Sequence, residues 1–167
     1  GVADFDDVYS QAKQTSLFDD LEVGRIDPGE FCEGVRSIAN IDASDSEICD
    51  AWNAMLLDFP PERFDLLKEM GSRYQIYLLS NTNEIHLKAF EQIVLNQNGV
   101  EGLGTYFEAA YYSHRLGMRK PDESTFEHIL QLNNLKAAET LFIDDSIQHV
   151  EGARSVGLVA IHLDVLQ

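Results

Sequence analysis

The segment Thr140-Leu-Phe-Ile-Asp-Asp-Ser-Ile-Gln-His-Val-Glu-Gly-Ala-Arg154 decides the fold of this 167-residue chain. An apolar run ends in two adjacent carboxylates, Asp144 and Asp145, and a helical pattern begins near Ser146. This pattern predicts a buried strand with paired acids at its carboxyl end, where open α/β sheets place their sites. Two such acids repel each other unless a cation neutralises them, and oxygen ligands suit Mg²⁺. Alternatively, either Asp is simply the N-cap of the helix that follows.

Two further segments carry polar side chains at corresponding places. The stretch 74–83 reads as a strand that ends in Ser80, and the turn 117–122 contains Lys120 and Pro121. Ser80 and the N–H groups of the following helix start can hold phosphate oxygens. Lys120 supplies a positive charge to phosphate or to a carboxylate nucleophile. Pro121 is suited to the first position of a helix.

Helical and strand patterns alternate from residue 60 onward, which predicts an α/β fold with a parallel sheet and helices on both faces. The strand runs are continuously apolar, as expected for parallel strands buried on both faces. We predict a loop over 96–104. The expected helices cover 61–70, 83–95, 121–132 and 146–156, and the expected strands cover 74–79, 108–112, 141–143 and 158–163.

The first 59 residues read as helical, with no convincing strand. Asp27-Pro28-Gly29-Glu30 and Ser44-Asp45-Ser46-Glu47 both have the residue pattern of a capped helix start. Trp52 is expected to anchor the packing of these helices. We therefore predict two domains, a helical one over 1–59 and an α/β one over 60–167.

Taken in order, these motifs resemble those of the haloacid dehalogenase-like hydrolases, and specifically their small sugar-phosphate phosphatases of the glucose-1-phosphate type. Ser80-Asn81-Thr82-Asn83 is similar to the second motif, Lys120 to the third, and Asp144-Asp145, followed by Glu151-Gly152-Ala153, to the fourth. The resemblance runs from about residue 18 to the C-terminus. It implies a Rossmann-like, three-layer core with a small helical cap, which 1–59 would form.

The resemblance also implies a mechanism, that of a Mg²⁺-dependent phosphomonoesterase working through an aspartyl-phosphate. Ser80, the backbone at Asn81 and Lys120 would bind the phosphoryl oxygens. Asp145 would coordinate Mg²⁺ directly. Asp144 would contact a metal-bound water, or would hold another ligand of the metal without touching the ion.

In this family a turn of the cap lies near the phosphate pocket, and the segment 21–26 is similar to it. The resemblance therefore implies that Arg25 holds a sugar hydroxyl or a second phosphate and that Glu22 holds a hydroxyl. The alternative is a surface ion pair that flanks a turn. Relatives often have Asp or Asn where this chain has His149, which puts a supporting carboxylate near the metal in doubt.

The family's first motif, Asp-x-Asp after an N-terminal strand, has only Asp4-Phe5-Asp6 as an early candidate. Three residues precede it, and 8–13 read as a helix, so we expect that Gly1 is not the natural start. A strand carrying the nucleophile is expected upstream, placed between the strand leading to Ser80 and the one leading to Asp144. The chain as written is then expected to be inactive.

Other functions stay open at this point. A phosphosugar mutase of the same fold would differ mainly in its cap. Dehalogenases of this fold typically lack the acid pair, so Asp144 and Asp145 argue against that chemistry. If Gly1 were the true start, a non-catalytic pseudo-phosphatase that binds partners would be the leading interpretation.

The composition of the chain limits the kinds of molecule that it is expected to bind. A net charge of −17 argues against binding to nucleic acid or to an anionic membrane. No apolar run approaches the roughly 18 residues of a membrane span. Cys32 and Cys49 lack metal-ligand spacing and are expected to be free buried thiols in a reducing cytoplasm. The expected partner is a small phosphorylated metabolite, bound by a monomer or a homodimer.

Overall fold

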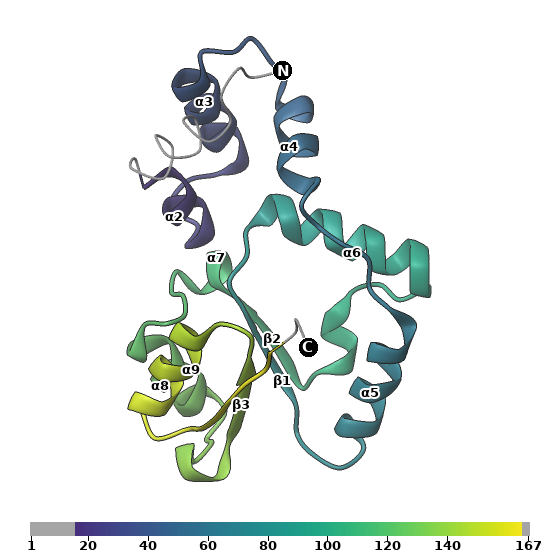
Figure 1. The fold of residues 1–167 in the computed structure, drawn as a ribbon, viewed down its shortest axis with the longest axis vertical. Helices are drawn as coiled ribbons and strands as arrows, with labels where there is room; N and C mark the ends of the chain where they lie inside the picture. Colours follow the sequence, from purple (N-terminus) through teal and green to yellow (C-terminus); the bar gives the residue numbers. More distant parts are fainter. Residues whose placement is uncertain (1–15, 165–167) are drawn as a thin grey trace. The chain divides into compact units, whose positions relative to one another are not determined.

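The computed structural model describes residues 16–164 and divides the chain into two compact units, 1–117 and 118–167 (Figure 1). Both units contain helices and short parallel strands, which confirms the predicted α/β class. Asp4-Phe5-Asp6 and the first 15 residues of the predicted helical domain lie outside the described residues. The domain boundary near residue 59 stays a prediction. Within 16–164, no helix has the length and apolar character needed to cross a membrane.

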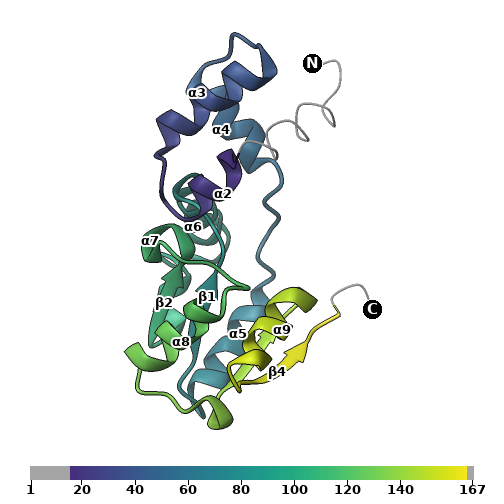
Figure 2. The ribbon, with the colours of Figure 1, turned by 90° about the vertical axis from the view of Figure 1, so that its left-hand side faces the viewer.

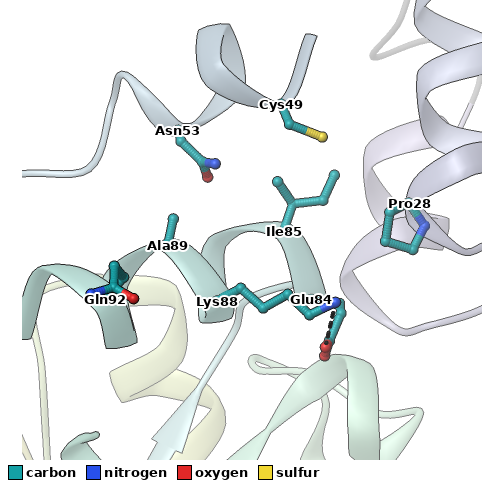
Figure 3. Close-up of a pocket in the computed structure, with 8 residues that line it drawn as sticks. All are labelled: Pro28, Cys49, Asn53, Glu84, Ile85, Lys88, Ala89 and Gln92. Atoms are coloured by element: carbon teal, nitrogen blue, oxygen red, sulfur yellow. Dashed lines mark ion pairs between the residues drawn. The ribbon is translucent and has the colours of Figure 1, made fainter. Parts of the chain in front are cut away.

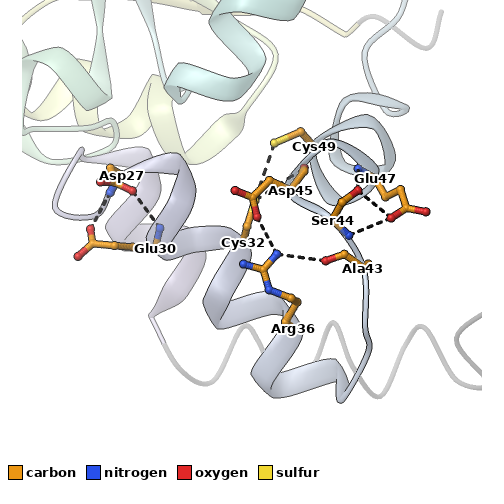
Figure 4. Close-up of polar contacts among 9 residues, drawn as sticks. All are labelled: Asp27, Glu30, Cys32, Arg36, Ala43, Ser44, Asp45, Glu47 and Cys49. Atoms are coloured by element: carbon orange, nitrogen blue, oxygen red, sulfur yellow. Dashed lines mark hydrogen bonds and ion pairs between the residues drawn. The ribbon is translucent and has the colours of Figure 1, made fainter.

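The first unit begins with three helices, α2 (Leu17–Glu22), α3 (Pro28–Ala39) and α4 (Asp45–Asn53). Both predicted helix starts are confirmed as capping boxes (Figure 4). The Asp27 carboxylate accepts from the Glu30 N–H at 2.9 Å, and the Asp27 N–H donates to the Glu30 carboxylate at 2.9 Å. Ser44 and Glu47 form the same reciprocal pair at α4. These local bonds satisfy N–H groups that a helix start otherwise leaves open.

Aromatic stacking organises the core of these helices. Trp52 stacks on Phe18 with ring centroids 5.0 Å apart and on His86 with centroids 5.1 Å apart. Phe31 is buried beside them, 5.7 Å from the Trp52 ring. The predicted anchoring role of Trp52 is therefore confirmed.

The two cysteines lie between α3 and α4 and are free thiols, as predicted. Their sulfur atoms are 3.9 Å apart (Figure 4). Cys32 is buried and Cys49 is half-buried. Burial and the neighbouring Cys49 thiol raise the pKa of Cys32 to about 12, so this thiol stays protonated at neutral pH.

The rest of the first unit contains one pair of parallel strands. β1 (Tyr77–Ser80) pairs with β2 (Ala109–Tyr112) in the register Tyr77↔Ala109 to Ser80↔Tyr112. Leu87 and Phe90 pack with Tyr112 in a buried apolar cluster. The remaining elements are α5 (Pro61–Gly71), α6 (Glu84–Asn98), the 3-10 turn η1 (Leu103–Tyr106) and the short helix α7 (Ser113–Leu116).

The second unit contains a second pair of parallel strands. β3 (Leu141–Asp144) pairs with β4 (Val159–His162), and α9 (Ile147–Ser155) connects them and lies alongside β4 (Figure 2). Phe126 of α8 (Glu123–Leu132) packs edge-on against Phe142, with centroids 5.2 Å apart. A 3-10 turn, η2 (Ala137–Glu139), leads into β3.

Within the described residues the strands form two separate parallel pairs, β1 with β2 and β3 with β4. Burial of the strands on both faces is wrong for β3, because Leu141 and Ile143 are each 51% exposed. Phe142 lies between them on the opposite face, which α8 covers.

Two predicted boundaries are wrong. Pro121 does not open a helix, because α8 begins at Glu123 after a turn in which the Asp122 N–H donates to the Arg119 carbonyl at 3.1 Å. The predicted loop over 96–104 is partly helical, since α6 continues to Asn98 and η1 follows. The polar residues of this segment do not mark a loop, because they contact distant parts of the chain. The Gln97 amide oxygen accepts from the Phe59 N–H at 3.0 Å.

Candidate active site

Asp144 sits at the carboxyl end of β3 and is held by three donors. Lys120 Nζ donates to Asp144 Oδ2 at 2.6 Å. The Ser146 N–H donates to Oδ1 at 2.8 Å, and His149 Nδ1 lies 2.9 Å from the same oxygen. Because an ionised carboxylate only accepts, Nδ1 of His149 must carry the proton. The Asp144 side chain is 9% exposed, so its orientation is fixed on every side.

The ionisation of Asp144 follows from these contacts. Burial raises the pKa of the Asp144 carboxyl, but the hydrogen bond from Lys120 and those from Ser146 and His149 outweigh it. The net pKa lies below its ordinary value, so Asp144 is an anion at neutral pH.

Lys120 reaches Asp144 from the turn before α8. Its side chain is 8% exposed, and Nζ lies 5.5 Å from the centroid of the Phe142 ring. The buried hydroxyl of Thr125 donates to the Arg119 carbonyl at 2.8 Å and fixes the turn. A Cβ on Gly152 would lie 2.3 Å from the Pro121 carbonyl oxygen, so only glycine lets α9 approach this turn so closely.

Asp145 differs from its neighbour, because its side chain is exposed. Its backbone carbonyl oxygen lies 2.9 Å from His162 Nε2. Neither acid is the N-cap of α9, since Ser146 occupies that position, and the alternative interpretation of the acid pair is wrong.

The acid pair offers part of a metal site. Carboxylate oxygens are ligands that Mg²⁺ prefers, and Asp145 is accessible to an ion while Asp144 is committed to Lys120. Within residues 16–164, no group of three or more His, Cys, Asp or Glu side chains is arranged to hold a metal. These residues therefore fit Mg²⁺ as part of a ligand set. Asp145 would bind the ion, and Asp144 would support the site without binding the ion directly.

The end of β1 carries the second set of predicted residues. Ser80 is the last residue of the strand, half-buried and paired in register with Tyr112, and Asn81 follows it. The Asn83 side chain caps α6 by accepting from the His86 N–H at 3.0 Å. The start of α6 therefore follows Ser80 and Asn81 directly, as predicted, and it is a place where anions bind in many proteins.

Sequence reasoning missed the residues that hold this loop. Ser113 is fully buried, and its hydroxyl both accepts from the Thr82 N–H at 2.9 Å and donates to the Thr82 carbonyl at 2.8 Å. His114 adds a contact from Nδ1 to the same carbonyl at 3.1 Å. The register of β1 with β2 places Ser113 one residue past the ladder, and no pattern in the sequence shows this register.

Two of the predicted substrate-binding residues, Glu22 and Arg25, lie at the end of α2 and in the turn after it. Arg25 pairs with the Asp20 carboxylate on the surface, which is a different partner from the Glu22 of the ion-pair alternative. Glu22 is half-buried. The roles of Arg25 and Glu22 toward substrate stay predictions.

A pocket lies between α4 and α6 in the first unit (Figure 3). Its surface is mostly apolar, with an ion pair between Lys88 Nζ and Glu84 Oε1 at 3.3 Å on one side. It contains none of the predicted phosphate-binding residues. The lining residues are Pro28, Cys49, Asn53, Glu84, Ile85, Lys88, Ala89 and Gln92.

Comparison with known proteins gives one matching family model, described as haloacid dehalogenase-like hydrolase, over residues 40–157. A D-ribitol-5-phosphate phosphatase of Bacteroides thetaiotaomicron is 26% identical over 157 residues, which cover 94% of this chain and 76% of that protein. A sesquiterpene phosphatase of Aspergillus oryzae is 29% identical over 150 residues, covering 89% of this chain and 73% of that protein.

Solved structures give the same result. A crystal structure of a haloacid dehalogenase family enzyme from Bacteroides thetaiotaomicron superposes with a TM-score of 0.92 and 30% identity, covering all of this chain and 82% of that one. An aspartate-to-alanine variant of that enzyme, complexed with magnesium and inorganic phosphate, has a TM-score of 0.83 and 31% identity over 96% of this chain and 82% of that one. The predicted Rossmann-like fold class is confirmed.

Proposed function

Because this chain belongs to the haloacid dehalogenase-like hydrolases, we propose that it is a Mg²⁺-dependent phosphomonoesterase acting on a small sugar phosphate. The observation that carries the proposal is the Lys120–Asp144 ion pair beside the exposed carboxylate of Asp145. Such a pair is suited to binding a metal and the phosphate it accompanies, because it combines fixed positive charge with an accessible oxygen ligand.

The substrate class rests on the relatives. A phosphatase named for D-ribitol 5-phosphate aligns with 94% of this chain, which supports a sugar or sugar-alcohol phosphate. A second relative is named a sesquiterpene phosphatase and is about as similar to this chain in sequence. The alcohol part of the substrate therefore differs between these two relatives. We therefore expect the phosphoryl group, and not the alcohol, to be what the residues at the strand ends recognise.

In the proposed reaction, each site residue binds the phosphoryl group or the metal, or orients another site residue. Ser80 Oγ and the Asn81 N–H hold phosphoryl oxygens, and Lys120 offsets their negative charge. Asp145 would hold Mg²⁺, and Asp144 keeps Lys120 in place. The bound ion would supply charge neutralisation at the phosphoryl oxygens.

The attacking group is a carboxylate, which forms an aspartyl-phosphate while the bond from phosphorus to the alcohol oxygen breaks and the alcohol leaves with a proton. Water then hydrolyses the aspartyl-phosphate and releases inorganic phosphate. The attacking carboxylate is not one of the site residues predicted within 16–164. Glu22, at the end of α2, is proposed to bind a substrate hydroxyl, and Arg25, in the turn after it, a sugar hydroxyl or a second phosphate. Both would then set selectivity more than rate.

The test is turnover of D-ribitol 5-phosphate and p-nitrophenyl phosphate by the complete natural protein, with Mg²⁺ and with EDTA. We expect hydrolysis only with Mg²⁺, and a loss of at least about a hundredfold in Asp145→Asn. Asp58→Asn, an exposed acid between α4 and α5, is the matched control and should keep full activity. Equal turnover with EDTA, or full activity in Asp145→Asn, would refute the proposal. Transfer of phosphate within the sugar, without release, would instead identify a mutase.

We propose that this protein works in the cytoplasm on a small phosphorylated metabolite, as a monomer or a homodimer. Two thiols whose sulfur atoms lie 3.9 Å apart without a disulfide are compatible with a reducing compartment.

A further inference from the structure

Thr82 lies two residues after Ser80 and is 7% exposed, so its backbone groups need protein partners. The Ser113 hydroxyl provides both, accepting from the Thr82 N–H and donating to the Thr82 carbonyl. Ser113 is itself 0% exposed. A single hydroxyl that satisfies both groups of one residue fixes the path of the chain between Ser80 and α6.

His114 extends this support to the first turn of α6. Its Nδ1 lies 3.1 Å from the Thr82 carbonyl oxygen, and its Nε2 lies 3.2 Å from the Glu84 carboxylate. The side chain is only 6% exposed. Both ring nitrogens thus face acceptors, and a ring with two N–H groups donates to both, whereas a neutral ring donates to one.

Two other cationic side chains share the Glu84 carboxylate with His114. Glu84 also pairs with Lys88 at 3.3 Å and with Arg115 at 3.7 Å. The Tyr112 ring stacks on His114 with centroids 6.2 Å apart. Glu84 is therefore a shared acceptor that ties His114, and through it the Thr82 carbonyl, to the start of α6.

The backbone of His114 also contacts the turn after α2. Gly24 has φ +69°, and a Cβ placed on it would lie 2.2 Å from the His114 carbonyl oxygen. No side chain fits there, so the turn that follows Glu22 and carries Arg25 rests directly on His114. One dipeptide, Ser113-His114, therefore meets the turn of the helical region, the loop after β1 and the start of α6.

We infer that Ser113 and His114 are positioning residues for phosphate binding, which hold the Ser80–Asn83 loop and the Gly24 turn in a common register. Neither residue touches the phosphate. The inference rests on the proposed function of Ser80 and Asn81, and it adds the residues that determine how well those two are placed. Loss of the Ser113 hydroxyl leaves two buried backbone groups of Thr82 without this partner, which frees the loop.

The test compares Ser113→Ala with Thr105→Val in the complete natural protein. Thr105 makes the same kind of bond in the same unit, from its hydroxyl to the Gly102 carbonyl at 3.1 Å, away from the loop. We expect Ser113→Ala to raise both KM and the inhibition constant of inorganic phosphate by about tenfold. Thr105→Val should leave both constants unchanged, and Ser113→Thr, which keeps the hydroxyl, should restore most of the phosphate affinity.

A second variant keeps the test decisive if Ser113→Ala folds poorly. His114→Gln removes the bridge between Thr82 and Glu84 and should raise the phosphate inhibition constant by about threefold, with the exposed His128→Gln as control. Unchanged phosphate inhibition in both Ser113→Ala and His114→Gln, in a protein whose wild type hydrolyses phosphate esters, would overturn the inference alone. A wild type without turnover would instead overturn the proposed function.

Discussion

The carboxyl ends of β1 and β3 both carry predicted site residues, but they are held in different ways. At β3, Asp144 is fixed by a lysine, a histidine and a backbone N–H, so charge dominates. At β1, the loop after Ser80 is fixed mainly by the neutral hydroxyl of Ser113, which bonds to the backbone of Thr82. Ionic contacts therefore fix the end of β3, and neutral hydrogen bonds to backbone groups fix the end of β1.

This difference has energetic consequences. A buried ion pair is strongly destabilised when one partner is lost, because the other charge stays buried. A buried hydroxyl-to-backbone bond contributes less, and its loss mainly frees the segment that it held. Substitutions at β3 should therefore lower both stability and activity, whereas substitutions at β1 should act on phosphate affinity first.

The largest effect is expected for Lys120→Met, which keeps the length of the side chain and removes its charge. Asp144 would lose its closest partner in a site where both side chains are under 10% exposed. We expect the free energy of unfolding to fall by about 3–5 kcal/mol and turnover to fall by at least about a hundredfold. Urea denaturation and phosphate-release kinetics would measure the two effects.

Lys136→Met is the matched control, because Lys136 pairs with Glu139 at 3.0 Å on an exposed surface. Exposed pairs contribute about 0–1 kcal/mol, so stability and turnover should barely change. If both lysine variants lost the same stability, charge would not be what distinguishes the end of β3.

A smaller effect is expected for Gly24→Ala, which tests whether the turn after α2 rests on His114. The new Cβ would overlap the His114 carbonyl oxygen at 2.2 Å, in addition to the strain of φ +69°. We expect a loss of about 2–3 kcal/mol in the free energy of unfolding, measured by urea denaturation. Gly99→Ala has nearly the same φ, +68°, and no atom within 4 Å of the new Cβ, so it should lose only about 1 kcal/mol. Equal losses at the two glycines would show that the His114 contact does not matter.

His149→Leu is expected to act at β3 more weakly than Lys120→Met. It removes one of three donors to Asp144 and leaves Lys120 in place. A lost hydrogen bond to a charged group costs about 1.5–3 kcal/mol, so unfolding should shift by about that amount. The exposed His128→Leu should have no comparable effect on the urea midpoint. A His149→Leu protein as stable as His128→Leu would remove His149 from the arrangement.

The smallest effect concerns His86, in the first turn of α6. Burial lowers the pKa of His86 below its ordinary value and outweighs its hydrogen bond to the Trp52 carbonyl. As pH falls below about 6.5, the unfolded chain binds this proton before the folded chain does, so stability declines. Unfolding followed by the fluorescence of Trp52, the single tryptophan, should shift to lower urea between pH 7.5 and pH 5.5. In His86→Phe the shift should be smaller; an unchanged shift would assign the pH dependence to other groups.

The comparison of the two strand ends also explains what the sequence could predict. The helix starts at Asp27 and Ser44 depend on residues three apart, so their patterns are visible in the sequence. The acid pair follows directly from an apolar run, and Lys120 was found through a family motif. Ser113 could not be found this way, because its role depends on the register of β1 with β2 and on backbone groups, which have no sequence signature.

Other differences have the same origin. The sequence shows His149 only as a departure from relatives, whereas in the folded chain it donates to Asp144 from the first turn of α9. Gln97 and Asn98 looked like loop residues, but they end α6 and bond to the backbone at Phe59, 38 and 39 residues away. Polar side chains with distant backbone partners are the feature that local patterns do not show.

The most direct test of the proposed phosphate-binding function is a calorimetric titration of inorganic phosphate into the complete natural protein, with and without Mg²⁺. We predict that phosphate binds only when Mg²⁺ is present, and that Ser80→Ala and Asp145→Asn each weaken binding by about tenfold or more. Phosphate affinity that is independent of Mg²⁺ and unchanged in both variants would contradict the account.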